Sequence, residues 1–231
     1  MAKKEVVKVI FDNIASKYDF LNHLLSLNID KGWRREAMKY IGEKRGVNLL
    51  DVACGTGDFS IAAYHSGVSR VTGIDISASM VEVGREKVRE FGLGDYIDLR
   101  LGDCERIDFY DGTFDVVTVA FGVRNFEHLK QGLKEMYRVL KPGGRVIILE
   151  FSMPVYFPVR QLYKLYFRHI LPVVGGWVSG NRGAYAYLPA SVMEFPQGEA
   201  FVRILMHCGF RNPLCQRLSA GIASIYVGEK E

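Results

Sequence analysis

The sequence predicts an α/β protein whose mostly parallel sheet is covered by helices on both faces and ends in an antiparallel C-terminal hairpin. Between residues 47 and 151, short apolar segments alternate with helical ones, which is typical of successive β-α-β units. These strands are apolar along most of their length, as strands buried on both faces are. The last two strands are joined by a turn too short for a crossover helix, so we expect them to pair antiparallel. The 231 residues suit a single domain.

The composition is that of a folded globular protein. Hydrophobic residues make up 48% of the chain and charged residues 24%, which argues against disorder. The net charge of +4 includes no long run of Lys or Arg, so we expect no nucleic-acid partner. The four cysteines form no C-x-x-C pair and are expected to be reduced thiols. The chain lacks an apolar signal segment and any run near the roughly 20 apolar residues that span a bilayer. We therefore expect a cytoplasmic protein.

Local signals bound the expected elements. Residues 1–45 are expected to form a helical cap, because apolar residues recur at helical spacing between Val6 and Tyr18. Asp30 is placed to cap a second helix over residues 30–41, and Ser77 to cap a helix that Gly92 ends. The Lys-Pro-Gly-Gly segment at 141–144 is expected to stop another helix. Strands are predicted at residues 47–53, 70–76, 96–101, 114–121, 145–151, 212–218 and 222–227, and later helices at 56–65, 78–91, 127–140 and 198–208.

Acidic residues and glycines stand at the ends of the first three predicted strands, where open α/β sheets bind ligands. Gly55 and Gly57 allow a sharp turn and a close approach of the backbone to a ligand. The helix after this turn presents free N–H groups to a carboxylate. Asp75 ends the second strand, where a carboxylate can accept both hydroxyls of a ribose. Asp103 follows the third strand and can accept from an adenine amino group.

Two cofactors fit such a loop, a dinucleotide and S-adenosylmethionine (SAM). The dinucleotide fingerprint G-x-G-x-x-G is incomplete, because Ser60 stands at the third glycine position. Asp51 and Asp58 flank the loop and would repel a pyrophosphate, whereas Asp51 can hold the cationic end of SAM. The sequence therefore favours SAM. The expected cofactor-binding residues are Asp51, Ala53, Gly55, Thr56, Gly57, Asp75, Ile76, Asp103, Cys104 and Phe121.

Several segments along nearly the whole chain resemble the ubiquinone/menaquinone biosynthesis C-methyltransferase family. The glycine loop and the Lys-Pro-Gly-Gly turn are shared by many methyltransferases. The Gly-Val-Arg-Asn segment at 122–125 and the Tyr-Ala-Tyr-Leu-Pro segment at 185–189 are much more specific to this family. The segments that carry the resemblance are residues 11–22, 50–58, 121–126, 135–144, 185–191 and 195–196.

The resemblance implies a class I SAM-methyltransferase fold, which is Rossmann-like with a seven-stranded sheet. It also implies SAM-dependent methylation of a ring carbon on a polyprenylated quinol such as demethylmenaquinol. That chemistry needs a stabilised phenolate and an aligned carbon. We expect Arg124 and Asn125 to support the phenolate and Tyr18 to close the pocket. Arg stays protonated and is a poor base. The alternative for Arg124 is a structural ion pair with Glu127.

Residues 152–196 form an aromatic and basic insertion, without Asp or Glu from 151 through 193. Tyr163, Tyr185 and Tyr187 are expected to line the substrate channel, with core packing as the alternative. Between residues 159 and 171, basic residues share one helical face and apolar residues another. Such a helix can contact an anionic membrane from the cytoplasmic side or pack as a lid on the domain. The sequence leaves homo-oligomerisation open.

The sequence offers no metal site, since the five histidines are scattered without ligand-like spacing. Two alternatives to a quinol methyltransferase remain at this point. One is a methyltransferase for another phenol or lipid. The other is a non-catalytic subunit that organises a quinone-biosynthetic complex, against which the complete set of cofactor residues argues. Menaquinone and ubiquinone precursors are not distinguished.

Overall fold

The computed structural model describes residues 4–26, 28–42, 45–166 and 182–231. Its seven-stranded sheet has the order β3-β2-β1-β4-β5-β7-β6. The first five strands pair in parallel, and β7 pairs antiparallel with both β5 and β6. The predicted α/β sheet with its antiparallel hairpin is confirmed. The strands are β1 (Asn48–Val52), β2 (Arg70–Asp75), β3 (Ile97–Leu101), β4 (Phe114–Ala120), β5 (Leu140–Phe151), β6 (Arg211–Leu218) and β7 (Ala223–Glu229).

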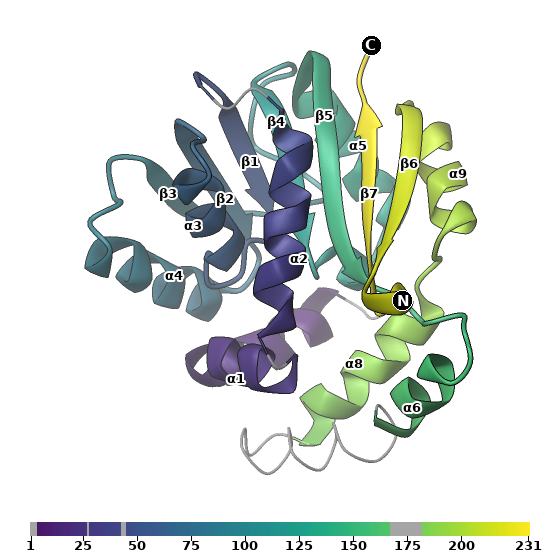
Figure 1. The fold of residues 1–231 in the computed structure, drawn as a ribbon. Coiled ribbons are helices and arrows are strands. Elements are labelled where there is room, and N and C mark those ends of the chain that lie inside the picture. The colour runs from purple at the N-terminus through teal and green to yellow at the C-terminus, as the bar shows by residue number, and fades with distance from the viewer. Residues whose placement is uncertain (1–3, 27, 43–44, 167–181) are drawn as a thin grey trace.

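Helices cover both faces of the sheet, and a third group lies at its lower edge in Figure 1. One face packs against α2, α3 and α4, and the other against α5 and α9. The third group, α1, α6 and α8, lies beside the carboxyl ends of the parallel strands, where the cofactor site was predicted. The helices are α1 (Lys4–Leu25), α2 (Ile29–Met38), α3 (Asp58–His65), α4 (Ala78–Glu90), α5 (Leu129–Val139), α6 (Val159–Leu165), α8 (Arg182–Glu194) and α9 (Glu199–His207), with short 3-10 turns η1 (Lys39–Ile41), η2 (Val123–Asn125) and η4 (Ser219–Gly221).

The predicted helix boundaries hold at α4 and differ at α2. The hydroxyl of Ser77 accepts a hydrogen bond from the N–H of Met80, as an N-cap does. Gly92 follows α4 with a φ of +66°. Asp30, however, is not the N-cap of α2. That position is taken by Asn28, and Asp30 lies in the first turn, where its carboxylate is buried and bonds to Arg34. The short spacing of four residues to Arg34 explains this arrangement, because it brings the two side chains onto one helix face.

Strand β5 is longer than predicted. It begins at Leu140 and runs through the Lys-Pro-Gly-Gly segment, which was expected to be a turn. The pairing with β4 shifts register between Phe114 and Val116, and this irregularity accommodates the segment within the strand.

Side chains along β1 alternate between the two faces of the sheet. Leu49 packs in the core on the side of α3, whereas Leu50 and Val52 pack on the side of α5. The period of two therefore places the side chain of Asp51 on the face covered by α3.

Candidate active site

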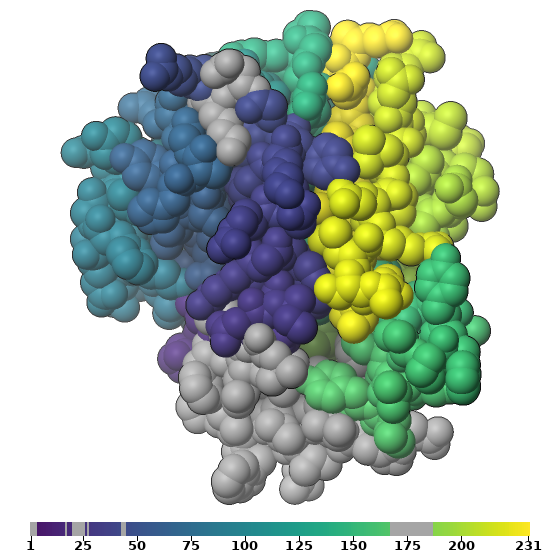
Figure 2. All heavy atoms as spheres, viewed as in Figure 1, coloured from purple at the N-terminus to yellow at the C-terminus, as the bar shows by residue number. Residues whose placement is uncertain are grey.

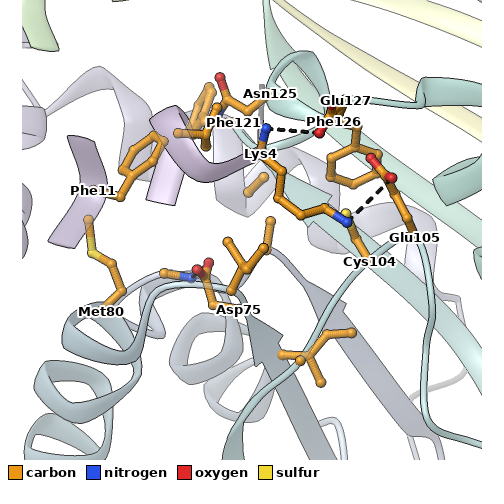
Figure 3. Close-up of a pocket in the computed structure, with 18 of the residues that line it drawn as sticks. Lys4, Phe11, Asp75, Met80, Cys104, Glu105, Phe121, Asn125, Phe126 and Glu127 are labelled. Carbon is orange, nitrogen blue, oxygen red and sulfur yellow. Dashed lines mark hydrogen bonds and ion pairs between the residues drawn. The ribbon is translucent and has the colours of Figure 1, made fainter. Parts of the chain in front are cut away.

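A cleft with about 690 Å³ of space, partly open to solvent, lies at the carboxyl ends of the parallel strands (Figure 3). Helix α1 forms one of its walls through Lys4, Val7, Phe11 and Tyr18. Figure 3 shows Asp75 and Met80 on one side of the cleft and Phe121 and Asn125 on another. The predicted residues that line it are Tyr18, Ala53, Gly55, Asp75, Ile76, Cys104, Phe121 and Asn125.

The loop between β1 and α3 depends on its glycines for its path. Gly55 and Gly57 have φ values of +54° and +79°, in the left-handed region that favours glycine. A Cβ on Gly57 would also come within 3.0 Å of the side chain of Leu99. Ala53 and Phe121 adopt φ values of 53° and 58° although they are not glycines. Such strain gathers at functional sites, and both residues line the cleft.

Asp75 ties the loop to the end of β2. One oxygen of its carboxylate accepts a hydrogen bond from the N–H of Gly55 at 2.8 Å, and the other accepts from the N–H of Ser77 at 2.9 Å. Burial raises the pKa of this carboxyl above its ordinary value. Each carboxylate oxygen has two lone pairs. Asp75 can therefore keep these backbone bonds and still accept hydrogen bonds from a ligand in the cleft.

Asp51 does not line the cleft. Its buried oxygens accept hydrogen bonds from Ser60 at 2.7 Å and Thr118 at 2.9 Å. Burial raises the pKa of Asp51 to about 6, although the two hydroxyls oppose the shift. Its place on the face of α3 aims it at Ser60 rather than at a ligand. Thr56 is likewise buried and donates to the carboxylate of Asp19 on α1. Gly57 lies in the same loop and does not line the cleft.

Lys4 closes one end of the cleft. Its Nζ lies 2.6 Å from Asp103 and 3.5 Å from Glu105, and its backbone N–H donates to Glu127 at 3.0 Å. Figure 3 shows this side chain extended toward Glu105 beside Cys104. Asp103 is thus held by Lys4 at the rim instead of lining the cleft. Lys4 was not predicted as a site residue, because nothing local in a charged N-terminal segment indicates that α1 lies along the cleft.

Arg124 is buried beside the cleft in η2. Its Nη1 donates to Glu150 at 2.8 Å and to the carbonyl of Phe121, and its Nε donates to Ser191 at 3.3 Å. Glu150, on β5, is its ion-pair partner, whereas Glu127 accepts the hydrogen bond from Lys4. The alternative pairing of Arg124 with Glu127 was wrong. Glu150 was missed, although a single carboxylate in the apolar run of β5 signals a buried partner.

The predicted substrate tyrosines lie in different places. The hydroxyl of Tyr187 donates to the side-chain oxygen of Asn125 at 2.8 Å. Tyr187 also lines a second cavity, with about 990 Å³ of space and partly open to solvent, together with Arg124 and Ser191. Tyr163 is buried in a small cluster with Val192 and does not line the cleft. Tyr185 falls within α8, and its side chain lies outside the described residues. Across the described chain, no three His, Cys, Asp or Glu side chains gather into a group that could hold a metal ion.

The cleft suits a ligand with both polar and apolar parts. Asp75 supplies a carboxylate for hydroxyls, and Gly55 presents its backbone to the cleft without a side chain of its own. Phe11, Ile76 and Met80 supply apolar surface for a flat ring. SAM combines an amino-acid end, a ribose and an adenine ring, so its chemical groups match this arrangement. When bound, it supplies an electrophilic methyl group.

Comparison with known proteins identifies the family to which the chain belongs. The model of the ubiE/COQ5 methyltransferase family matches residues 1–230. A demethylmenaquinone methyltransferase of Bacteroides fragilis is 45% identical over 229 residues, covering 99% of this chain and 94% of the relative. The ubiquinone/menaquinone biosynthesis C-methyltransferase UbiE of Geotalea uraniireducens is 49% identical over 230 residues, covering 99% of this chain and 97% of the relative.

Solved structures with low sequence identity share the fold. A SAM-dependent methyltransferase of Thermotoga maritima, described as a possible histamine N-methyltransferase, has a TM-score of 0.67 at 17% identity and covers 97% of this chain and 99% of its own. A putative SAM-dependent methyltransferase of Methanococcus maripaludis has a TM-score of 0.66 at 20% identity, and the match covers 100% of this chain and 95% of that protein. The fold is that of the class I methyltransferases. With the glycine loop, the cleft and the family match together, the chain belongs to the ubiE/COQ5 methyltransferase family and is a SAM-dependent methyltransferase.

Proposed function

We propose that this enzyme transfers the methyl group of SAM to a ring carbon of a polyprenylated quinol. The observation that carries the proposal is the position of Arg124 and Asn125 in the linings of two cavities that share Glu127. Asn125 lines the cofactor cleft, Arg124 lines the second cavity, and Glu127 lines both. The quinol ring would lie at this junction. The names of the relatives from Bacteroides and Geotalea support the choice of substrate.

The reaction requires a carbon nucleophile. Loss of the proton from a quinol hydroxyl makes the neighbouring ring carbon electron-rich. That carbon forms a bond to the methyl carbon as the methyl–sulfur bond breaks, leaving the pair of electrons on sulfur. The ring carbon then loses its own proton and the ring regains aromaticity. Arg124 stays protonated, so its role is to stabilise the phenolate. Asn125, held by Tyr187, orients the ring beside the cofactor cleft.

A head-group comparison tests the substrate class. Purified enzyme is incubated with SAM and short-chain precursors of menaquinol or ubiquinol, each freshly reduced, and the products are resolved by mass spectrometry. We expect methylation of at least one of these quinols and none of the oxidised quinone, which lacks the hydroxyl proton. Turnover of a simple phenol or a sterol, with no turnover of either quinol, would show that the substrate belongs to another class.

Asp75 is proposed to bind the ribose of SAM. Replacing Asp75 with Ala should weaken binding of S-adenosylhomocysteine by about 100-fold or more, because two hydrogen bonds to a charged group are lost. The loop would also lose its bonds to Gly55 and Ser77. Isothermal titration measures the change. Asp98→Ala, an exposed acid on β3 that pairs with Arg100, is the matched control. Unchanged affinity in Asp75→Ala would exclude this role.

The segment around α6 is proposed to contact an anionic membrane. Helix α6 packs inward through Tyr163 but leaves Leu162 63% exposed, and Phe157, two residues before the helix, is 81% exposed. Arg160 and Lys164 are exposed on the same short segment. Figure 2 shows this segment, in green, standing out at the lower right of the molecule. Apolar side chains flanked by basic ones are typical of an interfacial helix. Within the described residues, no helix has the length and apolar character needed to span a bilayer.

Vesicle co-sedimentation tests this contact. With vesicles rich in phosphatidylglycerol at low salt, the wild-type protein should sediment, and Phe157→Ser/Leu162→Ser should remain in the supernatant. Tyr110→Ser is the matched control, since Tyr110 is 90% exposed and precedes β4 at the opposite end of the sheet. If wild type and the double variant sediment equally, α6 does not carry the contact.

A further inference from the structure

Glu150 is a buried carboxylate in an otherwise apolar stretch of β5. It is fully buried, as are its neighbours from Val146 to Leu149. Burying a charge without partners costs much free energy, so the groups that pair with Glu150 indicate its role. Neither the cofactor cleft nor the second cavity is lined by Glu150.

Most hydrogen bonds of Glu150 go to Arg124. Oε1 accepts from Nη1 of Arg124 at 2.8 Å and from the N–H of Phe151 at 2.8 Å. Oε2 accepts from the backbone N–H of Arg124 at 3.2 Å. One carboxylate therefore holds both the main chain and the side chain of Arg124. This double attachment fixes the turn η2 and the guanidinium together.

The other contacts complete the orientation of the guanidinium. Nη1 also donates to the carbonyl of Phe121, Nε donates to Ser191, and the group lies over the ring of Phe151 at 5.5 Å from the centroid. These bonds use Nε and Nη1. Among the described residues, none accepts a hydrogen bond from Nη2. Nη2 is thus the nitrogen that remains for a ligand in the cavity that Arg124 lines.

We propose that Glu150 is a positioning residue for methyl transfer, because it holds Arg124 with Nη2 directed to the ionising hydroxyl of the substrate. This inference rests on the proposed role of Arg124. Glu150 touches neither substrate nor cofactor and acts only through Arg124. The planar guanidinium suits such an arrangement, since one edge can be fixed by a carboxylate while the remaining nitrogen stays directed elsewhere.

A purely structural role predicts different behaviour. Replacing a buried ion pair with apolar side chains of similar volume is often neutral or favourable for stability. If the pair served packing alone, apolar residues at positions 124 and 150 together should preserve both folding and function. A positioning role instead predicts that the effect of changing Glu150 depends on Arg124.

The test is a double-mutant cycle on the full-length enzyme. Glu150→Gln should lower kcat by at least about tenfold, as a small displacement of a catalytic group does, while KM for SAM stays within about twofold. Gln offers an amide in place of Oε2 and would turn a donor toward the backbone N–H of Arg124. In the Arg124→Met background, Glu150→Gln, which closes the cycle, and Glu150→Leu should each change kcat by less than about twofold, because residues that act as one unit are non-additive.

The Arg124→Met/Glu150→Leu variant leaves no unpaired charge, so it keeps the cycle measurable if Glu150→Gln folds poorly. Glu135→Gln is the matched control, because Glu135 pairs with Arg138 on α5 away from the cleft; its kcat should not change. A normal kcat in Glu150→Gln, or a further tenfold loss when Glu150→Leu is added to Arg124→Met, would overturn the positioning role. Full turnover in Arg124→Met would instead overturn the proposed role of Arg124 itself.

Discussion

Replacing Arg124 with Met is expected to lower kcat by about 100- to 1000-fold, the usual loss when one preorganised donor to a developing oxyanion is removed. Met keeps much of the length of the side chain but cannot donate to a phenolate. Because Arg124 lies outside the cofactor cleft, binding of S-adenosylhomocysteine should stay within about twofold. The measurement combines single-turnover kinetics with isothermal titration.

Stability must be separated from chemistry in this variant. Arg124→Met leaves Glu150 buried without its partner, and breaking one side of a buried pair costs about 3–5 kcal/mol. Kinetics are therefore compared at a temperature where circular dichroism shows a folded protein, and Arg124→Met/Glu150→Leu is measured beside it. Arg138→Met, which breaks an ion pair on α5, serves as a control with normal kcat. A loss of kcat that disappears in the more stable double variant would assign the effect to folding.

Replacing Asp51 with Asn is expected to raise the free energy of unfolding at pH 7 by up to about 3 kcal/mol, since one pKa unit corresponds to 1.36 kcal/mol. Burial raises the pKa of Asp51 to about 6, from its ordinary value of 3.8. Between these two pH values the folded protein binds more protons than the unfolded chain. Stability from this group is therefore fully present below about pH 4 and is lost as the pH rises through about 6. Asn removes this dependence.

Urea denaturation at several pH values between 5 and 8 measures the effect. Asn can still accept from Thr118 and donate to Ser60, so the local hydrogen bonds are preserved. Asp98→Asn, an exposed position on β3, is the control and should change stability little. A loss of stability in Asp51→Asn at pH 7 would mean that the ionised carboxylate is required by its neighbours, contrary to the burial argument.

Much of the fold could be predicted because its signals are local. Alternating apolar segments, the cap at Ser77 and the glycine at Gly92 depend on neighbouring residues only. Where the prediction failed, a side-chain contact or a strand pairing decided. Asp30 has the side chain of an N-cap but bonds to Arg34, and the register shift at Phe114 extended β5 through a segment that resembles a turn.

The site was predicted less completely, because a residue belongs to it only if its side chain points into the cleft. Asp75 and Gly55 line the cleft as expected, since strand β2 ends at Asp75 and the backbone turns at Gly55. Asp51 was expected to face the cofactor, yet the two-residue period of β1 directs it to Ser60. Lys4 and Glu150 join segments more than twenty residues apart in sequence, and no local pattern gives such pairings.

Isotope-labelled methyl transfer tests the central claim most directly. The enzyme is supplied with SAM carrying a trideuterated methyl group and with a short-chain demethylquinol, and the product is examined by NMR and mass spectrometry. We predict a trideuteromethyl group bonded to a ring carbon, with both hydroxyls retained after reduction. A trideuteromethyl group on a quinol oxygen, or no transfer to the quinol from an enzyme that binds SAM, would contradict C-methylation at the junction of Arg124 and Asn125.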